Sequence, residues 1–503
     1  MGKFILFWAP KIKRVLRMDL YKFTQGNSKY IYDSNINQIV KVDDAVYNIL
    51  PFDMDRIDKE NLLPEMREAL NEIEEYRKEY NLFRPKKAQR IYIDFEDVKK
   101  KLNSNIHHLI LNVTDRCNMR CKYCVYGEYY KIGSTRRCTM SWKTAKRAID
   151  FLLEKSELTR NFIVGFYGGE PLLEFELIKK IVLYAKERIK ASGKKVRFSI
   201  TTNGTIIDRD VARFLIDENF SVLISIDGPE DVHDRYRIFR NGKGTWKKIN
   251  KSLQRIRDID EDFYMKHVGF SIVLAPPFEL IKVHDFFKRF NLSTNGSYIV
   301  TIPNRNGTTF YDSFPKEIWL EYDKQIKKLR NIMIDDLMNK KKTDRFIESF
   351  FIRDLKRRWH DRMVGESELL NANGICIPGH QRTFIDVKGY IYPCEKLSYR
   401  LRIGHISRGF DLQRVKSILD SFINTCEKCY DCWLRRTCSI CFSRVVTKSD
   451  DGDFEISDER KSICCKKEMK IGESSLLLYV RLLEICPWVF GDKSKNSKNT
   501  NKK

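Results

Sequence analysis

The central part of the chain alternates apolar, β-branched runs with amphipathic helical stretches. Six of these runs, between about residues 107 and 303, predict strands: HHLILNVTD, NFIVGFYGG, VRFSITTNGT, SVLISIDG, HVGFSIVLAP and SYIVTIP. The stretches between them, such as SWKTAKRAIDFLLEKS, carry apolar residues three and four positions apart, which is the spacing of a buried helix face. Repeated βα units predict a parallel sheet, either an open doubly wound sheet or a partial barrel.

Three of the predicted strands end in polar or glycine-rich segments, namely TDRCN, YGGEP and SIDGP. Parallel α/β sheets build their active sites at the carboxyl ends of their strands. We therefore expect the chemistry of this chain at that edge of the sheet.

The central core, assigned to residues 105–314, is flanked by sequence of a different character. Residues 1–104 open with short predicted strands and continue as helical stretches, which indicates a small β-then-α module. Residues 315–370 predict a basic helical connector. Residues 371–475 are turn-rich and cysteine-rich, so we expect metal rather than a packed apolar core to organise them. A basic tail is expected over residues 476–503.

Length, charge and cysteine content narrow the class of protein. The 503 residues suffice for two or three domains, and the net charge of +25 favours an acidic partner without identifying it. The apolar stretch near the start is short, is broken by Pro10, and has Leu6 where an N-myristoylation signal needs Ser or Thr. We expect a soluble, cytoplasmic protein without a membrane span. Its 14 cysteines then predict metal ligands rather than disulfides, and only Cys138 and Cys486 resemble isolated buried thiols.

The segment CNMRCKYC places Cys117, Cys121 and Cys124 on the loop after the first predicted strand. Three thiolates on one tight loop can hold three irons of a 4Fe-4S cluster and leave the fourth iron open. A zinc site is the alternative, but a closed zinc site needs a fourth ligand nearby.

These residues resemble the radical S-adenosylmethionine (SAM) superfamily, whose signature is a CxxxCxxC loop with an aromatic residue before the last cysteine. Tyr123 fills that place, and GGEP ends the second predicted strand as it does in the family. The resemblance covers about residues 107 to 303 and implies a partial (β/α)6 TIM-type barrel. It also implies a radical SAM oxidoreductase that binds a 4Fe-4S cluster and S-adenosyl-L-methionine.

By this resemblance the open iron chelates the amino and carboxylate groups of SAM, and the GGE segment hydrogen-bonds the ammonium group. An anionic Glu170 beside an ammonium group makes a strong, charge-assisted hydrogen bond. Ser225 and Arg237 match the family in type and place, although each also fits a surface or packing role. Ile272 to Leu274 should flank the adenine. The expected SAM contacts are Tyr123, Gly168, Gly169, Glu170, Thr202, Asn203, Ser225, Asp227, Arg237 and Val273.

A second cysteine region contains nine thiols within ninety residues, where two fully ligated 4Fe-4S clusters need eight. It resembles the SPASM domain, which holds two auxiliary 4Fe-4S clusters. The resemblance implies one cluster on Cys376, Cys394 and Cys441, and a second on Cys429, Cys432, Cys438 and either Cys464 or Cys465.

The segment CSIC is one residue shorter than the usual CxxxC of that domain, and no cysteine directly follows Cys376. The first cluster is therefore completed by Cys426 or keeps an open iron. A zinc ribbon is the alternative, but it leaves Cys376 and Cys394 unexplained.

The segment YKFTQGNSKYIYDSNINQIVKVDDAVYNIL resembles the start of peptide-maturing SPASM enzymes. In those enzymes a winged-helix-like module recognises a leader peptide by pairing a strand with it. The nearest resemblance is to maturases that form thioether crosslinks in cysteine-rich ribosomal peptides. It implies a leader-bearing precursor peptide and an electron donor such as ferredoxin or flavodoxin as partners, and no nucleic acid.

Other functions remain open at this point. An anaerobic sulfatase maturase that forms formylglycine shares the SPASM pattern, and a carbon-carbon crosslinking peptide maturase is also possible. A DNA-binding winged helix, or a cluster-bearing nucleic-acid binder, would explain the positive charge. Neither has a use for the GGEP and SIDGP segments.

Overall fold

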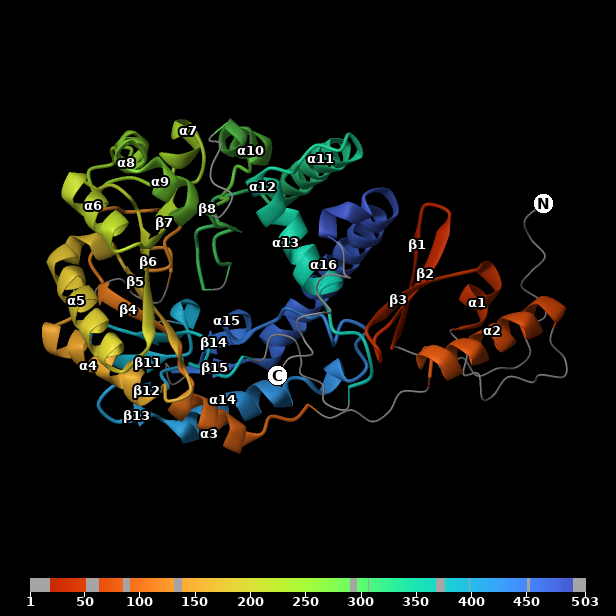
Figure 1. Ribbon diagram of the computed structural model, residues 1–503. Coiled ribbons are helices and arrows are strands. Elements are labelled where there is room, and N and C mark those ends of the chain that lie inside the picture. The colour runs from red at the N-terminus through yellow and green to blue at the C-terminus, as the bar shows by residue number, and fades with distance from the viewer. Residues whose placement is uncertain are drawn as a thin grey trace.

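Figure 1 shows a computed structural model of the chain. The N-terminal apolar stretch and the final basic run, discussed above, lie outside the described residues. No helix within the described part of the chain is both long and apolar enough to cross a membrane. The structure describes residues 19–50, 63–84, 91–130, 138–289, 296–305, 307–367, 376–397, 399–449 and 453–491.

A ten-stranded sheet forms the centre of the molecule, and all six predicted strands lie in it. They pair in parallel and follow one another across the sheet in chain order, without the reversal of order that a doubly wound sheet has. This order favours the partial-barrel arrangement. The six strands are β4 (His108–Thr114), β5 (Asn161–Gly168), β6 (Lys195–Thr202), β7 (Ser221–Ser225), β8 (Val268–Val273) and β9 (Tyr298–Thr301).

Helices cover the outer face of this sheet (Figure 1). Local signals set where several of them begin: Ser141 caps α4 by accepting the amide of Thr144, and Asp208 caps α6 through the amide of Val211. Their apolar faces bury residues such as Ile149 against the strands. The helices are α4 (Trp142–Glu154), α5 (Phe175–Ala191), α6 (Arg209–Asp217), α7 (Glu230–His233), α8 (Trp246–Ile259), α9 (Glu261–His267) and α10 (Leu280–Arg289).

The N-terminal part of the described chain is an antiparallel sheet in the order β1-β2-β3 followed by helices. Its own apolar core includes Ile31, Val46, Ile73 and Phe83. The elements are β1 (Leu20–Gln25), β2 (Ser28–Asp33), β3 (Gln38–Val42), α1 (Asp44–Ile49) and α2 (Pro64–Tyr80), and α3 (Phe95–Ser104) leads into the central sheet.

The connector is helical, as predicted, over the part that the structure describes. It contains α11 (Ile318–Met338), α12 (Arg345–Ile347) and α13 (Arg353–Leu355), with π-helical turns at Glu348–Ile352 and Lys356–His360.

The cysteine-rich region has a packed apolar core, so the expectation that only metal would organise it was wrong. Helix α14 (Leu412–Asn424) buries Val415, Ile418, Leu419 and Phe422, which recur three and four positions apart and so form one apolar face. These side chains belong to the same apolar cluster as the central sheet.

The same region extends the sheet and ends in a long helix. Strand β10 pairs in parallel with β4, and three short antiparallel strands follow it. Helix α16 (Asp458–Ile485) runs through the boundary expected at residue 475. The other elements are β10 (Thr383–Ile385), β11 (Tyr390–Tyr392), β12 (Gly404–His405), β13 (Gly409–Phe410), α15 (Phe442–Val445), β14 (Val446–Lys448) and β15 (Phe454–Ile456).

All 14 cysteines are free thiols, as expected for a chain without structural disulfides. Cys486 is buried, as predicted, but Cys138 is exposed, so its assignment as a buried thiol was wrong. Cys138 precedes the loop-to-helix junction at Ser141, and loop residues of this kind lie at the surface.

Candidate active site

The three cysteines of CNMRCKYC lie on one tightly turned loop directly after β4. The amide of Cys124 donates to the carbonyl of Cys121 at 3.1 Å, and the amide of Met119 donates to Cys117 Sγ at 3.4 Å. Burial raises the pKa of Cys117 to about 11 and that of Cys121 to about 12. Binding a metal cluster at this loop would therefore release protons from thiols that the fold alone keeps protonated.

The end of β5 packs directly against this loop. A Cβ atom at Gly168 would lie 2.3 Å from the carbonyl oxygen of Thr114, and one at Gly169 would lie 2.2 Å from that of Arg116. Gly168 also has a φ of +148°, a conformation that side chains disfavour. Only glycine lets the backbone of the GGEP segment approach the cysteine loop this closely.

The donor set fits an iron-sulfur cluster better than a hard cation, because it consists of thiols on a loop with no carboxylate among them. Within the described residues, no group of three or more His, Cys, Asp or Glu side chains is arranged to hold a single metal ion. Cys117, Cys121 and Cys124 are the residues that would hold the SAM-binding cluster.

Glu170 is fully buried at the end of β5, and both of its carboxylate oxygens are occupied. Oε1 accepts hydrogen bonds from Thr202 Oγ1 at 2.7 Å and from the amide of Leu172 at 3.1 Å, and Oε2 accepts the amide of Asn203 at 2.7 Å. Burial raises the pKa of Glu170 to about 7, and these hydrogen bonds oppose the rise. The carboxylate therefore joins the ends of β5 and β6.

Asn203 connects this group to the cysteine loop. Its side-chain Nδ2 lies 2.9 Å from Asn118 Oδ1 and 3.9 Å from Cys117 Sγ. Asn118 in turn donates to Thr205 Oγ1 at 2.8 Å. The structure thus brings three predicted site residues, Glu170, Thr202 and Asn203, to one side of the loop.

Asp227, which follows strand β7, contacts three further predicted site residues. Its Oδ1 accepts the amide of Val273 at 2.9 Å, and its Oδ2 lies 3.1 Å from Arg237 Nε and accepts the hydroxyl of Tyr123. Burial lowers the pKa of Arg237, but the charges of Asp227, Tyr123 and Cys121 together with the hydrogen bond to Asp227 hold that pKa above its ordinary value. Ser225 is buried at the end of β7 and pairs in register with Ser271.

Three residues near the site were not predicted. His233 accepts the amide of Asp227 at 3.2 Å, and Asn118 contacts Asn203 as described. Tyr399, from the cysteine-rich region, donates to Asp115 and accepts from Asn112 Nδ2 at 2.5 Å. Asn118 lies inside the segment CNMRCKYC and His233 lies four residues after SIDGP, so both could have been found there, whereas Tyr399 carries no local signal.

Eight of the nine later cysteines fall into two groups. Burial raises the pKa of Cys376 to about 11 and that of Cys394 to about 12. Smaller electrostatic effects of Cys441 on Cys376, and of both on Cys394, indicate that these three thiols lie close together. The second group contains Cys426, Cys429, Cys432, Cys438 and Cys465, which act electrostatically on one another.

Cys426 lies with the second group, although the sequence had left it open as a fourth ligand of the first. A hydrogen bond from Cys429 and the ammonium group of Lys461, 2.8 Å from Cys426 Sγ, lower the pKa of Cys426. Cys464 instead donates to the carbonyl of Arg444 at 3.5 Å. Of the two trailing cysteines, Cys465 is therefore the one beside the second group.

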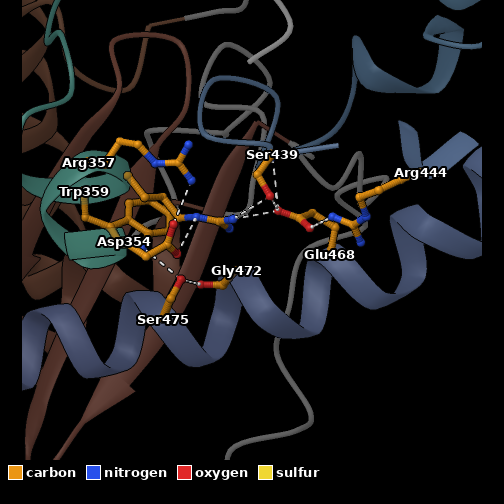
Figure 2. A network of polar contacts seen from close by, with 9 residues as sticks. Asp354, Arg357, Trp359, Ser439, Arg444, Glu468, Gly472 and Ser475 are labelled. Carbon is orange, nitrogen blue, oxygen red and sulfur yellow. Dashed lines mark hydrogen bonds and ion pairs between the residues drawn. The ribbon is translucent and has the colours of Figure 1, made fainter. Parts of the chain in front are cut away.

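A buried ion network fixes the segment that carries Cys438 and Cys441 (Figure 2). Glu468 of α16 accepts hydrogen bonds from Ser439 Oγ at 2.7 Å, Arg358 at 2.7 Å and Arg444 at 2.8 Å. Burial alone would raise the pKa of Glu468, but Arg358 and these hydrogen bonds lower it to about 2. The network ties the connector, the cysteine segment and α16 together.

The N-terminal module packs against the same cysteine-rich region. The rings of Tyr21 and Trp433 stack with centroids 3.9 Å apart, and Arg435 donates to Asn35 Oδ1 at 2.5 Å. Trp433 directly follows Cys432, so strand β1 lies beside the second cysteine group.

Comparisons with known proteins bear on the class of the central domain. Residues 111–277 match the sequence model of the Radical SAM superfamily. The cysteine-type anaerobic sulfatase-maturating enzyme of Clostridium novyi is 26% identical over 337 residues, which span 64% of this chain and 84% of that protein. The radical SAM cyclopropyl synthase TigE of Paramaledivibacter caminithermalis is 24% identical, over 57% of this chain and 62% of that protein.

A solved structure has the same fold. The structure of anSMEcpe with bound AdoMet superposes with a TM-score of 0.55 at 19% identity, covering 76% of this chain and 100% of that one. The sheet, the cysteine loop and these matches define a radical SAM domain. The chain is an enzyme with a Radical SAM superfamily domain, and it is similar to maturating enzymes.

Proposed function

We propose that this enzyme modifies a ribosomally made precursor peptide and installs thioether crosslinks from cysteine sulfur to carbon. The observation that carries the proposal is the N-terminal module, a small sheet that packs beside a cysteine group through Tyr21 and Trp433. A module in this position can deliver one end of a peptide while the rest reaches the sheet edge that holds Cys117.

The module can bind a peptide by strand addition. In the order β1-β2-β3, both β1 and β3 are edge strands within the described sheet, and Ile39 and Lys41 of β3 are not buried. An edge strand offers backbone donors and acceptors whatever the side chains of the peptide are. The anSMEcpe protein has been solved with AdoMet and a Cp18Cys peptide, which supports a peptide substrate for the shared fold.

When bound, the SAM-binding cluster and SAM supply a 5′-deoxyadenosyl radical that abstracts hydrogen. The chain's own part is to hold Cys117, Cys121 and Cys124 on a fixed loop and to keep water away from it. Tyr123, Tyr236 and Phe310 form an apolar group beside the loop, with the rings of Tyr236 and Phe310 5.5 Å apart. Asp227 holds Tyr123 and Arg237 in place on this side, and the SAM contacts expected from the sequence remain a proposal.

Two auxiliary 4Fe-4S clusters are part of the proposal. The first would use Cys376, Cys394 and Cys441, and the second would use ligands from Cys426, Cys429, Cys432, Cys438 and Cys465. The separation of the thiols into these two groups supports the assignment, because each group is rich enough in soft donors for one cluster. A cluster with an open iron could bind the substrate thiolate or accept the electron released as the bond forms.

Formylglycine formation in a sulfatase is the second candidate. The match across 84% of a cysteine-type sulfatase-maturating enzyme favours it. The same match covers only 64% of this chain, so the chain has additional sequence that this sulfatase-maturating enzyme does not share.

Mass spectrometry of the candidate substrates separates the two functions. We would incubate the anaerobically reconstituted enzyme with SAM and either a cysteine-rich precursor peptide or a sulfatase peptide. A thioether crosslink removes two hydrogens and keeps the sulfur, whereas formylglycine formation replaces the sulfur with oxygen. Loss of sulfur from the sulfatase peptide, with an unchanged precursor peptide, would overturn the thioether proposal.

A further inference from the structure

A shallow hollow of about 480 Å³ lies on the surface between the segment 239–244 and the first two turns of α8. Four lysines line it together with Phe239: Lys243, Lys247, Lys248 and Lys251. All four are exposed. Of these four lysines, only Lys247 has a carboxylate partner among the described residues, namely Glu230 at 3.3 Å. Most of the positive charge of the hollow is therefore not neutralised.

This hollow is joined to the cysteine loop by backbone hydrogen bonds. Phe239 pairs with Met119, which lies between Cys117 and Cys121, as an antiparallel bridge. The amide of Arg120 donates to the carbonyl of Ile238 at 2.7 Å. A partner bound in the hollow would therefore contact a segment that is itself paired with the cluster-binding loop.

Backbone pairing also holds the part of segment 239–244 that carries Lys243. The amide of Phe239 donates to the carbonyl of Lys243 at 2.9 Å, and Ile238 pairs with Gly244. Lys248 Nζ lies 5.8 Å from the centroid of the Phe239 ring. The cysteine loop adds further positive charge, because Arg120 and Lys122 are exposed.

We propose that the lysine hollow is the docking surface for an acidic one-electron carrier protein. This inference rests on the function proposed above, because SAM cleavage consumes one electron. One electron would leave the reduced carrier, oxidising it, and would reduce the cluster that Cys117, Cys121 and Cys124 would hold. Electron-transfer encounters use small interfaces and are steered by opposite charges, which suits a shallow lysine-lined hollow.

The test reverses three of the lysines, leaving Lys248 against Phe239. The variant is Lys243→Glu/Lys247→Glu/Lys251→Glu, and its matched control is Lys180→Glu/Lys190→Glu/Lys195→Glu, which reverses three exposed lysines elsewhere. Binding of flavodoxin, used as the acidic carrier, is measured by titration at low and raised salt. 5′-Deoxyadenosine formation is then measured with reduced flavodoxin and, separately, with dithionite.

We expect the hollow variant to bind flavodoxin on the order of tenfold more weakly than the wild type and the control, and binding by the wild type to weaken with salt. Its flavodoxin-driven rate should fall similarly while its dithionite-driven rate is unchanged. Equal flavodoxin binding by variant and wild type would overturn the inference. If the wild type forms no 5′-deoxyadenosine with dithionite, the proposed function fails, and the binding titration still decides the docking surface.

Discussion

The carboxylate of Glu170 accepts the backbone amide of Asn203 at 2.7 Å, which joins the ends of two neighbouring parallel strands beside the cysteine loop. Both residues were expected to contact SAM directly. In the structure, Glu170 joins the ends of β5 and β6, and the side chain of Asn203 contacts Asn118 and Cys117.

Replacing Glu170 should change how stability depends on pH. The pKa of Glu170, raised to about 7, exceeds that of an exposed carboxyl, so the folded chain binds more protons than the unfolded chain between about pH 5 and 7. The contribution of Glu170 to stability is therefore present at low pH and falls as pH rises through this window. The unfolding free energy of Glu170→Gln, measured with denaturant at several pH values, should not show this decline. Parallel pH curves for variant and wild type would contradict the account.

Asp227→Asn should destabilise the chain by about 3 to 5 kcal/mol, because it leaves the buried guanidinium of Arg237 without its countercharge. Denaturant unfolding measures the loss, and 5′-deoxyadenosine formation should fall with it. Asp231→Asn is the control. Asp231 pairs with Lys282 at the surface, where an ion pair contributes less than about 1 kcal/mol. Equal effects of the two substitutions would contradict the role of Asp227.

Glu468→Gln should weaken the cysteine-rich region, because it removes the charge that Arg358 and Arg444 face. We expect a loss of about 3 kcal/mol or more in unfolding free energy and lower iron content after reconstitution. The stability that Glu468 contributes should also be lost as pH falls from about 4.5 towards its pKa of about 2. Asp453→Asn, which alters an exposed pair with Arg414, should leave iron content unchanged.

Cys432→Ala should lower iron content by one cluster and stop peptide crosslinking while SAM cleavage persists, because Cys432 belongs to a group separate from the SAM-binding loop. Iron assay and mass spectrometry of the peptide measure the two effects. Cys138→Ala is the matched control, since Cys138 is exposed and outside both groups. Normal crosslinking by Cys432→Ala would remove the second auxiliary cluster from the account.

The sequence predicts those parts of the molecule that local patterns determine. Six strands and their helices follow from apolar periodicity, and the cysteine loop follows from spacing within a few residues. The sequence could not predict contacts between distant segments, such as Tyr399 with Asp115, which lie 284 positions apart. The apolar face of α14 was visible in its spacing, but the density of cysteines around it led to the wrong expectation of an unpacked region.

The most direct test of the central claim is 5′-deoxyadenosine formation by the variant in which Cys117, Cys121 and Cys124 are all replaced by Ala. The three thiols are the only ligands assigned to the SAM-binding cluster, and the later cysteines lie in separate groups. With dithionite and SAM, the wild type should form 5′-deoxyadenosine, and the variant should form none while retaining iron at the auxiliary groups. Undiminished 5′-deoxyadenosine from the variant would contradict the radical SAM mechanism.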